Sequence, residues 1–337
     1  MKKASIYIIL IALLVASCSG SKQSFSLSGK FKGLSQGEFM CYSASPEWGT
    51  LDTIKVQNGK FTFTHPLNDT IILYLQYPNF LQTQIIAIPG ESVSLDGDAN
   101  NILGVEVSGD DDNELLSDFR KSTVALKDKA LADAAEAFIK EHPESWASIA
   151  LFERHFVQAE HPDYAKIESL LNMMLKVRPD RKMLRAYSLQ LGSLLQCRAG
   201  KKLPSFSATT LNGQVVNNAS FKGKALLITF WSSMSNEFIY PVVNQKQLMR
   251  QCTGRLEQLN ICLDADTTSC KRILRNDSIR GYNVCDLQTF NSPLVSIFGL
   301  KDLPANILVD SLGVIRERDI APSELEATLR KYHILKP

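Results

Sequence analysis

Apolar and polar residues alternate along residues 25–110 with the period of two that is typical of strands with one buried face. Phe25, Leu27 and Phe31 occupy alternate positions, and the pair Asn58-Gly59 separates two such runs. Asn-Gly favours the tight turn of a hairpin, because both residues tolerate a positive φ. Further apolar runs, bounded by turn residues, continue to residue 107. The pattern predicts a small all-β sandwich or barrel over residues 25–110.

From residue 111 to about 200 the apolar spacing becomes helical, as in Leu115, Leu116 and Phe119. Proline follows His or Arg at three places in this segment, so we expect three or four helices that form a connector. The acidic run Asp110–Glu114 lacks the glycine and distal glutamate of a calcium loop. It is typical instead of a helix start, where the helix dipole stabilises carboxylates.

Strand and helix patterns alternate in residues 201–337. Residues 225–231 are a continuous apolar run that predicts a buried strand, and a helix is expected from about 235 to 252. A strand over 256–263, a helix over 267–279 and strands at 282–285, 305–309 and 314–319 follow. Ser323 and Glu326 have the spacing of a capping box before a closing helix. The chain as a whole therefore predicts an α+β multidomain protein that ends in an α/β layer domain.

The N-terminus has the pattern of a secreted precursor. Lys2 and Lys3 precede the apolar run 6–16, which is too short to span a membrane, so residues 1–17 are expected to be a signal peptide. Val15-Ala-Ser-Cys18 resembles the lipobox of bacterial lipoproteins, which implies a lipid anchor on Cys18 and a tether over 18–24. An ordinary signal peptide is the alternative. Without an acidic export run after Cys18, we expect an envelope protein on the outer membrane that faces the periplasm.

Charge argues against nucleic acid as a partner. The chain has 37 Lys plus Arg and 35 Asp plus Glu. Loss of Lys2 and Lys3 with the signal peptide would leave 35 basic residues, equal to the 35 acidic ones. A neutral chain without a basic tract lacks the electrostatic footprint of a nucleic-acid-binding protein.

Phe230-Trp231 is followed by Ser-Ser-Met-Ser-Asn-Glu-Phe238, a stretch that resembles the strand-to-helix junction of the TlpA/ResA branch of envelope thioredoxin-like proteins. In that family a Cys-x-x-Cys dithiol stands where this chain has Ser235 and Phe238. Pro304 lies in a stretch that resembles the one with the family's cis-proline, although an ordinary trans-proline is the alternative. The resemblance implies a thioredoxin-like domain over 201–337, and the 25–110 segment looks like the small β-domain that precedes such domains in envelope lipoproteins.

The motif also implies that the usual disulfide chemistry is missing, because exchange requires thiolates. Ser235 has no evident base, since His333 is the only histidine in residues 201–337. We therefore expect no catalytic residues and no enzyme activity. An oxidoreductase that uses Cys252, Cys270 or Cys285 instead is the alternative function. A structural disulfide between Cys252 and Cys285 or among the cysteines between them also stays open.

Five residues are expected to converge where the dithiol would sit. They are Trp231, Met234, Phe238, Leu303 and Pro304. Apolar side chains of this composition favour a binding surface for an extended segment of another envelope protein. The alternative is that they pack inward, which leaves a purely architectural role. No metal or cofactor is expected, because His142, His155 and His161 have no ligand at zinc spacing.

Overall fold

The computed structural model describes residues 23–49, 51–234, 236–252 and 254–335. The predicted signal peptide, Cys18 and Ser235 lie outside these residues. The chain divides into two compact units. The N-terminal unit extends to Pro162 and includes 176–178, and the C-terminal unit contains 163–175 and the chain from Pro179 onward. No helix in the described part of the chain is long and apolar enough to cross a membrane.

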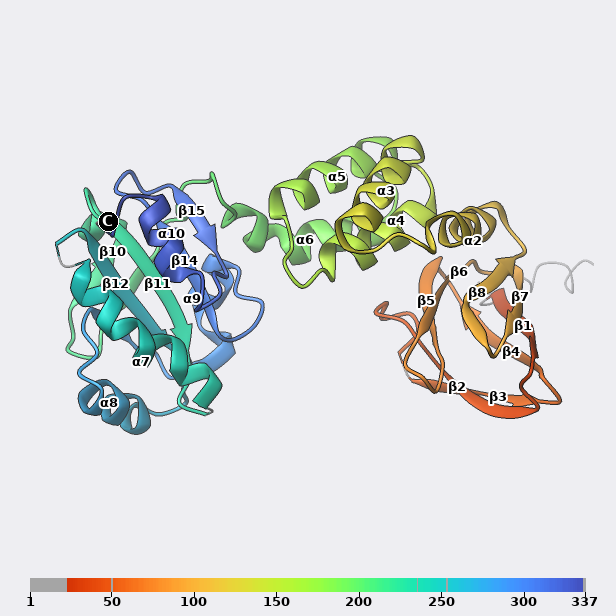
Figure 1. Ribbon diagram of the computed structural model, residues 1–337, viewed down its shortest axis with the longest axis horizontal. Coiled ribbons are helices and arrows are strands. Elements are labelled where there is room, and N and C mark those ends of the chain that lie inside the picture. Colours follow the sequence, from red (N-terminus) through yellow and green to blue (C-terminus); the bar gives the residue numbers. More distant parts are fainter. Residues whose placement is uncertain (1–22, 50, 235, 253, 336–337) are drawn as a thin grey trace, which may run out of the picture. The chain divides into compact units, whose positions relative to one another are not determined.

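The N-terminal unit is built on a barrel-like sheet of eight strands in the order β6-β5-β2-β3-β4-β1-β7-β8 (Figure 1). Its core contains Phe25, Leu27 and Phe31, as the alternation predicts. Asn58 and Gly59 have φ of 52° and 70° in the turn between β3 and β4, so the predicted hairpin is confirmed. The strands are β1 (Gln23–Lys32), β2 (Gln36–Tyr42), β3 (Asp52–Gln57), β4 (Lys60–Leu67), β5 (Ile71–Gln76), β6 (Gln82–Ala87), β7 (Ser92–Asp98) and β8 (Asn101–Ser108).

Helices follow the barrel within the same unit. Asp110 caps the first of them and accepts a hydrogen bond from the Asn113 amide at 3.0 Å, so the acidic run starts a helix as predicted. The helices are α2 (Asp111–Thr123), α3 (Asp128–Glu141) and α4 (Trp146–Phe152), and a short π-helical segment (Glu153–Val157) extends α4.

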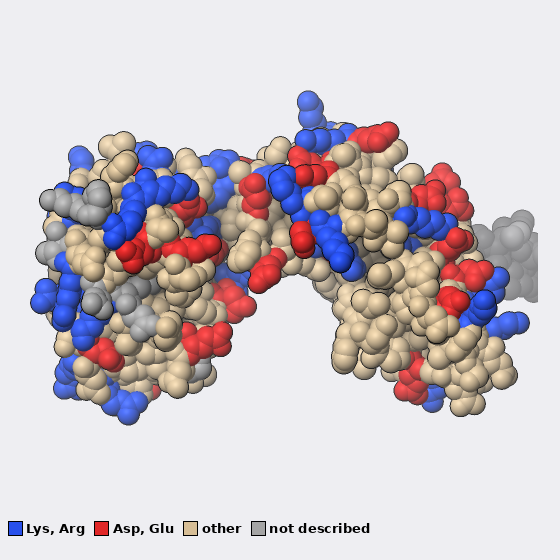
Figure 2. All heavy atoms as spheres, in the orientation of Figure 1, with Lys and Arg blue, Asp and Glu red and all other residues tan. Residues whose placement is uncertain are grey.

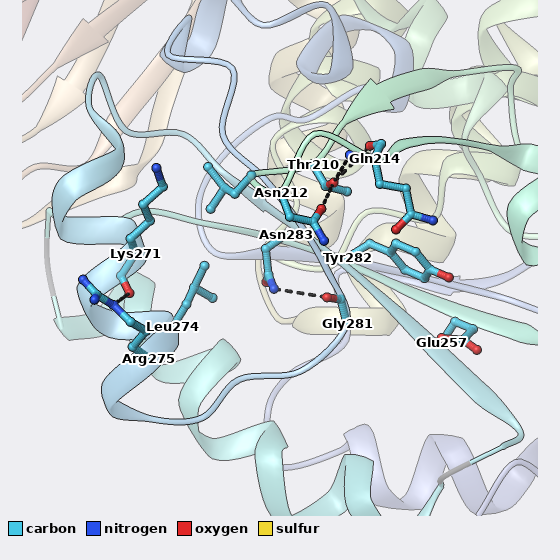
Figure 3. Close-up of a pocket in the computed structure, with 11 residues that line it drawn as sticks. Thr210, Asn212, Gln214, Glu257, Lys271, Leu274, Arg275, Gly281, Tyr282 and Asn283 are labelled. Carbon is cyan, nitrogen blue, oxygen red and sulfur yellow. Dashed lines mark hydrogen bonds between the residues drawn. The ribbon is translucent and has the colours of Figure 1, made fainter.

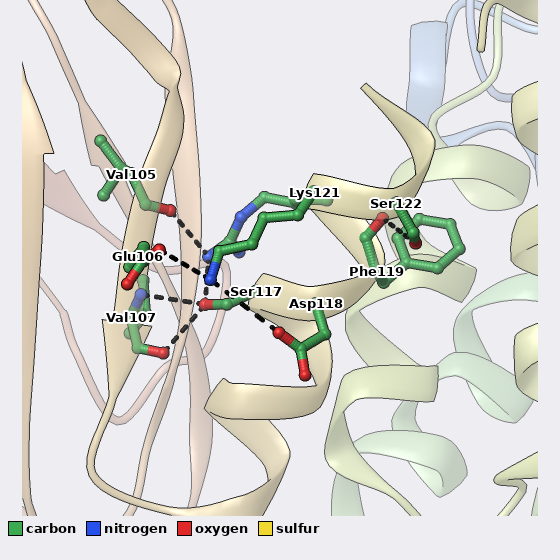
Figure 4. Close-up of polar contacts among 9 residues, drawn as sticks. Val105, Glu106, Val107, Ser117, Asp118, Phe119, Lys121 and Ser122 are labelled. Atoms are coloured by element: carbon green, nitrogen blue, oxygen red, sulfur yellow. Dashed lines mark hydrogen bonds and ion pairs between the residues drawn. The ribbon is translucent and has the colours of Figure 1, made fainter. Parts of the chain in front are cut away.

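Polar contacts fasten α2 to the barrel. Ser117 Oγ accepts from the Val107 amide and donates to the Val107 carbonyl, both at 2.9 Å, and Lys121 lies 2.7 Å from Glu106 (Figure 4). The side-chain amide of Asn113 donates to the Ile86 carbonyl of β6 at 2.8 Å, while its oxygen accepts from the Ile86 amide at 2.9 Å. These bonds satisfy backbone groups that α2 buries.

The C-terminal unit contains a five-stranded sheet in the order β13-β12-β11-β14-β15. Strands β11, β12 and β13 are parallel, and β14 and β15 run antiparallel to their neighbours. The strands are β11 (Ala225–Trp231), β12 (Leu256–Cys262), β13 (Tyr282–Val284), β14 (Ala305–Val309) and β15 (Ile315–Arg318), with β9 (Ser207–Thr209) and β10 (Val215–Asn217) as a separate hairpin. The helices are α5 (Tyr164–Val177), α6 (Lys182–Gln196), α7 (Asn236–Gln251), α8 (Thr267–Asn276), α9 (Pro293–Phe298) and α10 (Leu325–Lys331).

Strand β11 is buried on both faces, as its continuous apolar run predicts. Successive side chains of a strand point to opposite faces. Ile228 and Phe230 accordingly pack in one cluster with Phe298 of α9, whereas Leu227 packs in another with Leu329 of α10. These two core clusters hold the central strand, whose C-terminal end leads into the predicted site.

Two expectations need correction. The 111–200 segment holds five α-helices rather than three or four, and α5, apart from its last two residues, and α6 belong to the C-terminal unit. The closing helix begins at Leu325, and its N-cap Glu324 makes no side-chain cap, so Ser323 does not form the predicted capping box.

Gly299 ends α9 in the left-handed conformation, with φ of 59°. A β-carbon added there would lie 2.5 Å from the backbone nitrogen of Leu194 in α6. The glycine therefore allows the backbones of α6 and α9 to approach each other directly.

Candidate functional site

The predicted site lies at the C-terminal end of β11, where residues 232–234 lead to α7. Ser232 Oγ donates to Asp264 Oδ1 at 2.7 Å, and the Ser233 amide donates to the same oxygen at 2.9 Å. The Met234 amide donates to Ser232 Oγ at 3.2 Å. The buried Asp264 carboxylate thus fixes the path of the loop that presents Met234.

The second part of the site is the peptide bond between Leu303 and Pro304, which is cis, as the sequence predicts. Ala305 pairs with Phe230, so the bond lies beside the end of β11. The Leu303 amide donates to Asp302 Oδ1 at 2.9 Å. The backbone donor next to the proline is therefore already bonded, and a ligand that uses it must displace the Asp302 carboxylate.

The five predicted binding residues differ in exposure. Met234 is 83% exposed and Pro304 is exposed, whereas Trp231 is completely buried and Leu303 nearly so. Phe238 is half-buried and packs against the core cluster that contains Leu303. Of the five residues, Met234, Pro304 and part of Phe238 are thus accessible at the surface, whereas Trp231 and Leu303 are buried.

The cysteines proposed as alternative nucleophiles are buried. Cys252, Cys270 and Cys285 are each 9% exposed or less, and the described cysteines are all free thiols. Burial raises the pKa of Cys252 and of Cys285 above the ordinary value. Since the thiolate is the reactive form, burial and a raised pKa both oppose nucleophilic chemistry.

Sequence reasoning missed one grouping of these residues. Cys262 joins Cys270 and Cys285 in a cluster in which the three Sγ atoms lie within 4.8 Å of one another. Separations of eight and fifteen residues resemble no ligand motif, so only the fold reveals the cluster.

A cavity of about 660 Å³ lies between α8, the 210–214 segment and the residues around β13 (Figure 3). Leu211 and Leu274 line it and also pack against the cluster that contains the three cysteines. Lys271 and Arg275 of α8 add positive charge to its wall. The remaining lining residues are Thr210, Asn212, Gln214, Glu257, Gly281, Tyr282 and Asn283. The two leucines therefore connect the wall of the cavity with the packing around the thiols.

Charge is mixed on the face of the molecule that Figure 2 shows. Figure 2 shows basic and acidic side chains interspersed over the face in view, without a continuous tract of one sign. This distribution agrees with the nearly equal charge count of the sequence.

The sheet order of the C-terminal unit, its strand directions and the cis-proline beside the central strand define a thioredoxin-like domain. The predicted fold class, an N-terminal β-barrel-like domain, helices and a C-terminal thioredoxin-like domain, is confirmed.

Comparison with known proteins adds the families and relatives to which the chain is similar. Residues 25–116 match a domain of unknown function (DUF4369). Thiol-disulfide oxidoreductase ResA of Bacillus thuringiensis subsp. konkukian (strain 97-27) is 26% identical over 140 residues, which cover 39% of this chain and 77% of that protein. The chain is thus similar to TlpA/ResA-type thioredoxin-like proteins and carries a small domain in front, as the sequence predicts.

Solved structures are also similar. The C-terminal domain of a putative thiol-disulfide oxidoreductase from Bacteroides thetaiotaomicron is 27% identical, with 40% of this chain and 96% of that one covered and a TM-score of 0.37. A thioredoxin-like protein from Bacteroides caccae ATCC 43185 is 14% identical, with 60% and 78% covered and a TM-score of 0.48.

Proposed function

We propose that the C-terminal unit is a non-catalytic thioredoxin-like binding domain of an envelope lipoprotein. The observation that carries the proposal is the site at the end of β11, where the cis Leu303–Pro304 bond is present but the sequence has Ser235 and Phe238 at the two thiol positions. ResA is named a thiol-disulfide oxidoreductase. This chain shares the fold, whereas its motif lacks both sulfur atoms that exchange requires.

The proposed occupant is an extended segment of another envelope protein. Its backbone would pair with Leu303 beside the proline, and an apolar side chain would cover Met234 and the exposed part of Phe238. The Asp302 carboxylate competes for the Leu303 amide, because it already accepts that hydrogen bond at 2.9 Å. Binding therefore exchanges one hydrogen bond for another and gains its free energy mainly from apolar contact.

The test uses unstructured dodecapeptides selected from a random library on the full chain, with affinity measured by fluorescence anisotropy. We expect Met234→Asp to weaken binding by about tenfold or more, since an exposed apolar anchor becomes charged. Leu312→Asp is the matched control, because Leu312 is also well exposed (71%) but lies beyond the opposite end of β14. Asp302→Ala should tighten binding by roughly threefold, because it frees the Leu303 amide.

Equal affinities for Met234→Asp and Leu312→Asp would refute the proposed surface. Insulin reduction by the wild-type chain, lost on substitution of a buried cysteine, would instead support the oxidoreductase alternative. The Ser235→Cys, Phe238→Cys double variant provides the positive control for that assay.

The lipid anchor is proposed from Val15-Ala-Ser-Cys18 alone. We expect Cys18→Ser either to release the protein from membranes or to leave the precursor uncleaved, which fractionation and intact mass will measure. Normal processing together with unchanged membrane association would exclude the anchor.

A further inference from the structure

We propose that Cys262, Cys270 and Cys285 form a buried site for a thiophilic monovalent metal ion, Cu(I). This inference goes beyond the proposed binding function and does not depend on it. The three residues come from the end of β12, from α8 and from the position after β13. Strands β12 and β13 are parallel and pair Ile261 with Val284, so the next residues, Cys262 and Cys285, are neighbours across the two strands.

The geometry suits a metal ion. The three Sγ atoms lie within 4.8 Å of one another. A metal–sulfur bond of about 2.3 Å places the sulfurs of a tetrahedral or trigonal site roughly 3.8–4.0 Å apart. The thiols therefore need to approach by less than about an ångström to share one ion, which a side-chain rotation provides.

The surroundings separate this cluster from ordinary buried cysteines. Cys262, Cys270 and Cys285 are 1%, 0% and 9% exposed and pack with Trp231 and Val242. A single buried cysteine behaves as a small apolar side chain, which describes Cys252 well, because it packs in another cluster with aliphatic residues. Three thiols within 4.8 Å of one another differ from this case, because they place three soft donor atoms around one common point.

The donor set favours Cu(I) over Zn²⁺. Structural zinc is almost always four-coordinate, and among the described residues no histidine or carboxylate oxygen joins the three sulfurs. Soft thiolates without a fourth ligand suit a monovalent d¹⁰ ion. Each thiol that becomes a ligand loses its proton to solvent, and the ion keeps its oxidation state. Leu211 and Leu274 both line the neighbouring cavity and pack against the cluster, so the cavity lies on the side from which an ion could approach the thiols.

The test titrates the full chain anaerobically with Cu(I) supplied as its bicinchoninate complex. Every protein carries Cys18→Ser, and the chain with this substitution alone serves as the wild-type reference. We expect one retained copper per chain after desalting and a thiolate-to-copper absorption band in the near ultraviolet. Cys270→Ala should weaken retention by about tenfold or more, because it removes one of three ligands. Cys252→Ala is the matched control and should bind as the wild type does, because Cys252 is equally buried (0%) and lies outside the cluster.

A second measurement does not require a variant that folds. Copper should protect Cys262, Cys270 and Cys285, but not Cys252, from alkylation in the wild-type chain, as read by peptide mass spectrometry. Three results would overturn the proposal. They are copper retained equally by Cys270→Ala, a native disulfide within the cluster, and zinc retained in place of copper.

Discussion

The contact between α6 and α9 yields a prediction whose magnitude follows from the structure. Gly299→Ala places a β-carbon 2.5 Å from the Leu194 nitrogen and 2.6 Å from the carbonyl carbon of Ser193. Non-bonded carbon atoms prefer about 3.5–4.0 Å. The obstacle is helix backbone, which has no rotamer to change, so α6 and α9 must separate by roughly an ångström. Overpacking of this kind costs about 1–3 kcal/mol.

Conformation adds a second cost. Alanine in the left-handed region costs about 1 kcal/mol relative to glycine, so the total for Gly299→Ala is about 2–4 kcal/mol. Gly213→Ala isolates the conformational part, because Gly213 has φ of 84° and no atom within 4 Å of its added β-carbon. Both substitutions also reduce the entropy of the unfolded chain, which cancels in the comparison. Gly299→Ala should therefore destabilise the C-terminal unit by about 1–3 kcal/mol more than Gly213→Ala does.

Hydrogen exchange measured by mass spectrometry suits this prediction, since peptides from β11 report on the C-terminal unit within the full chain. A difference of 1–3 kcal/mol corresponds to about 5- to 150-fold faster exchange of the β11 amides in Gly299→Ala than in Gly213→Ala. Equal exchange in the two variants would refute the reasoning, because it would mean that α6 does not pack against Gly299.

Two further predictions concern the N-terminal unit. Asn113→Ala leaves the buried amide and carbonyl of Ile86 without these hydrogen-bond partners and should lower the free energy of unfolding by at least about 2 kcal/mol, as measured by calorimetry. Asn100 is exposed, so Asn100→Ala is the control and should change stability little. Similar melting temperatures for the two variants would contradict the prediction. Burial, and to a smaller extent the charge of Arg154, lowers the pKa of His155 from 6.5 to about 4. Between these two pH values His155 is therefore neutral in the folded state and protonated in the unfolded chain. The free energy of unfolding should therefore fall as pH decreases from about 6.5 towards 4. In thermal melts, the melting temperature of His155→Gln should fall less between pH 7.5 and 5 than that of the wild type. An unchanged pH dependence in the variant would contradict this.

Local signals in the sequence were sufficient for much of the fold. Asn58-Gly59 specified its hairpin through positive φ, Asp110 specified a helix start, and residues 225–231 specified a buried strand. Each rests on chemistry within a few residues. The capping-box pattern at Ser323 failed because the chain continues in turns up to Glu324 before the helix begins.

The site depended on tertiary structure. Whether Phe238 is exposed could not be read from the sequence, because it depends on how α7 packs over the cluster that contains Leu303. The cysteine cluster was equally hidden, since parallel pairing of β12 with β13 brings Cys262 beside Cys285 and α8 adds Cys270. The motif positions themselves were evident, because the sequence alone places Ser235 and Phe238 after β11.

Asp264 belongs to both of the proposed sites. Its carboxylate accepts from Ser232 and Ser233 in the loop that presents Met234, and its carbonyl accepts from the Cys285 thiol at 3.7 Å. Any shift of Cys285 towards a metal ion alters a hydrogen bond to the residue that holds the peptide-binding loop. Thermodynamic linkage then requires reciprocity, so the factor by which copper changes peptide affinity equals the factor by which peptide changes copper affinity. Through Asp264, the binding of either ligand would thus change the affinity of the protein for the other.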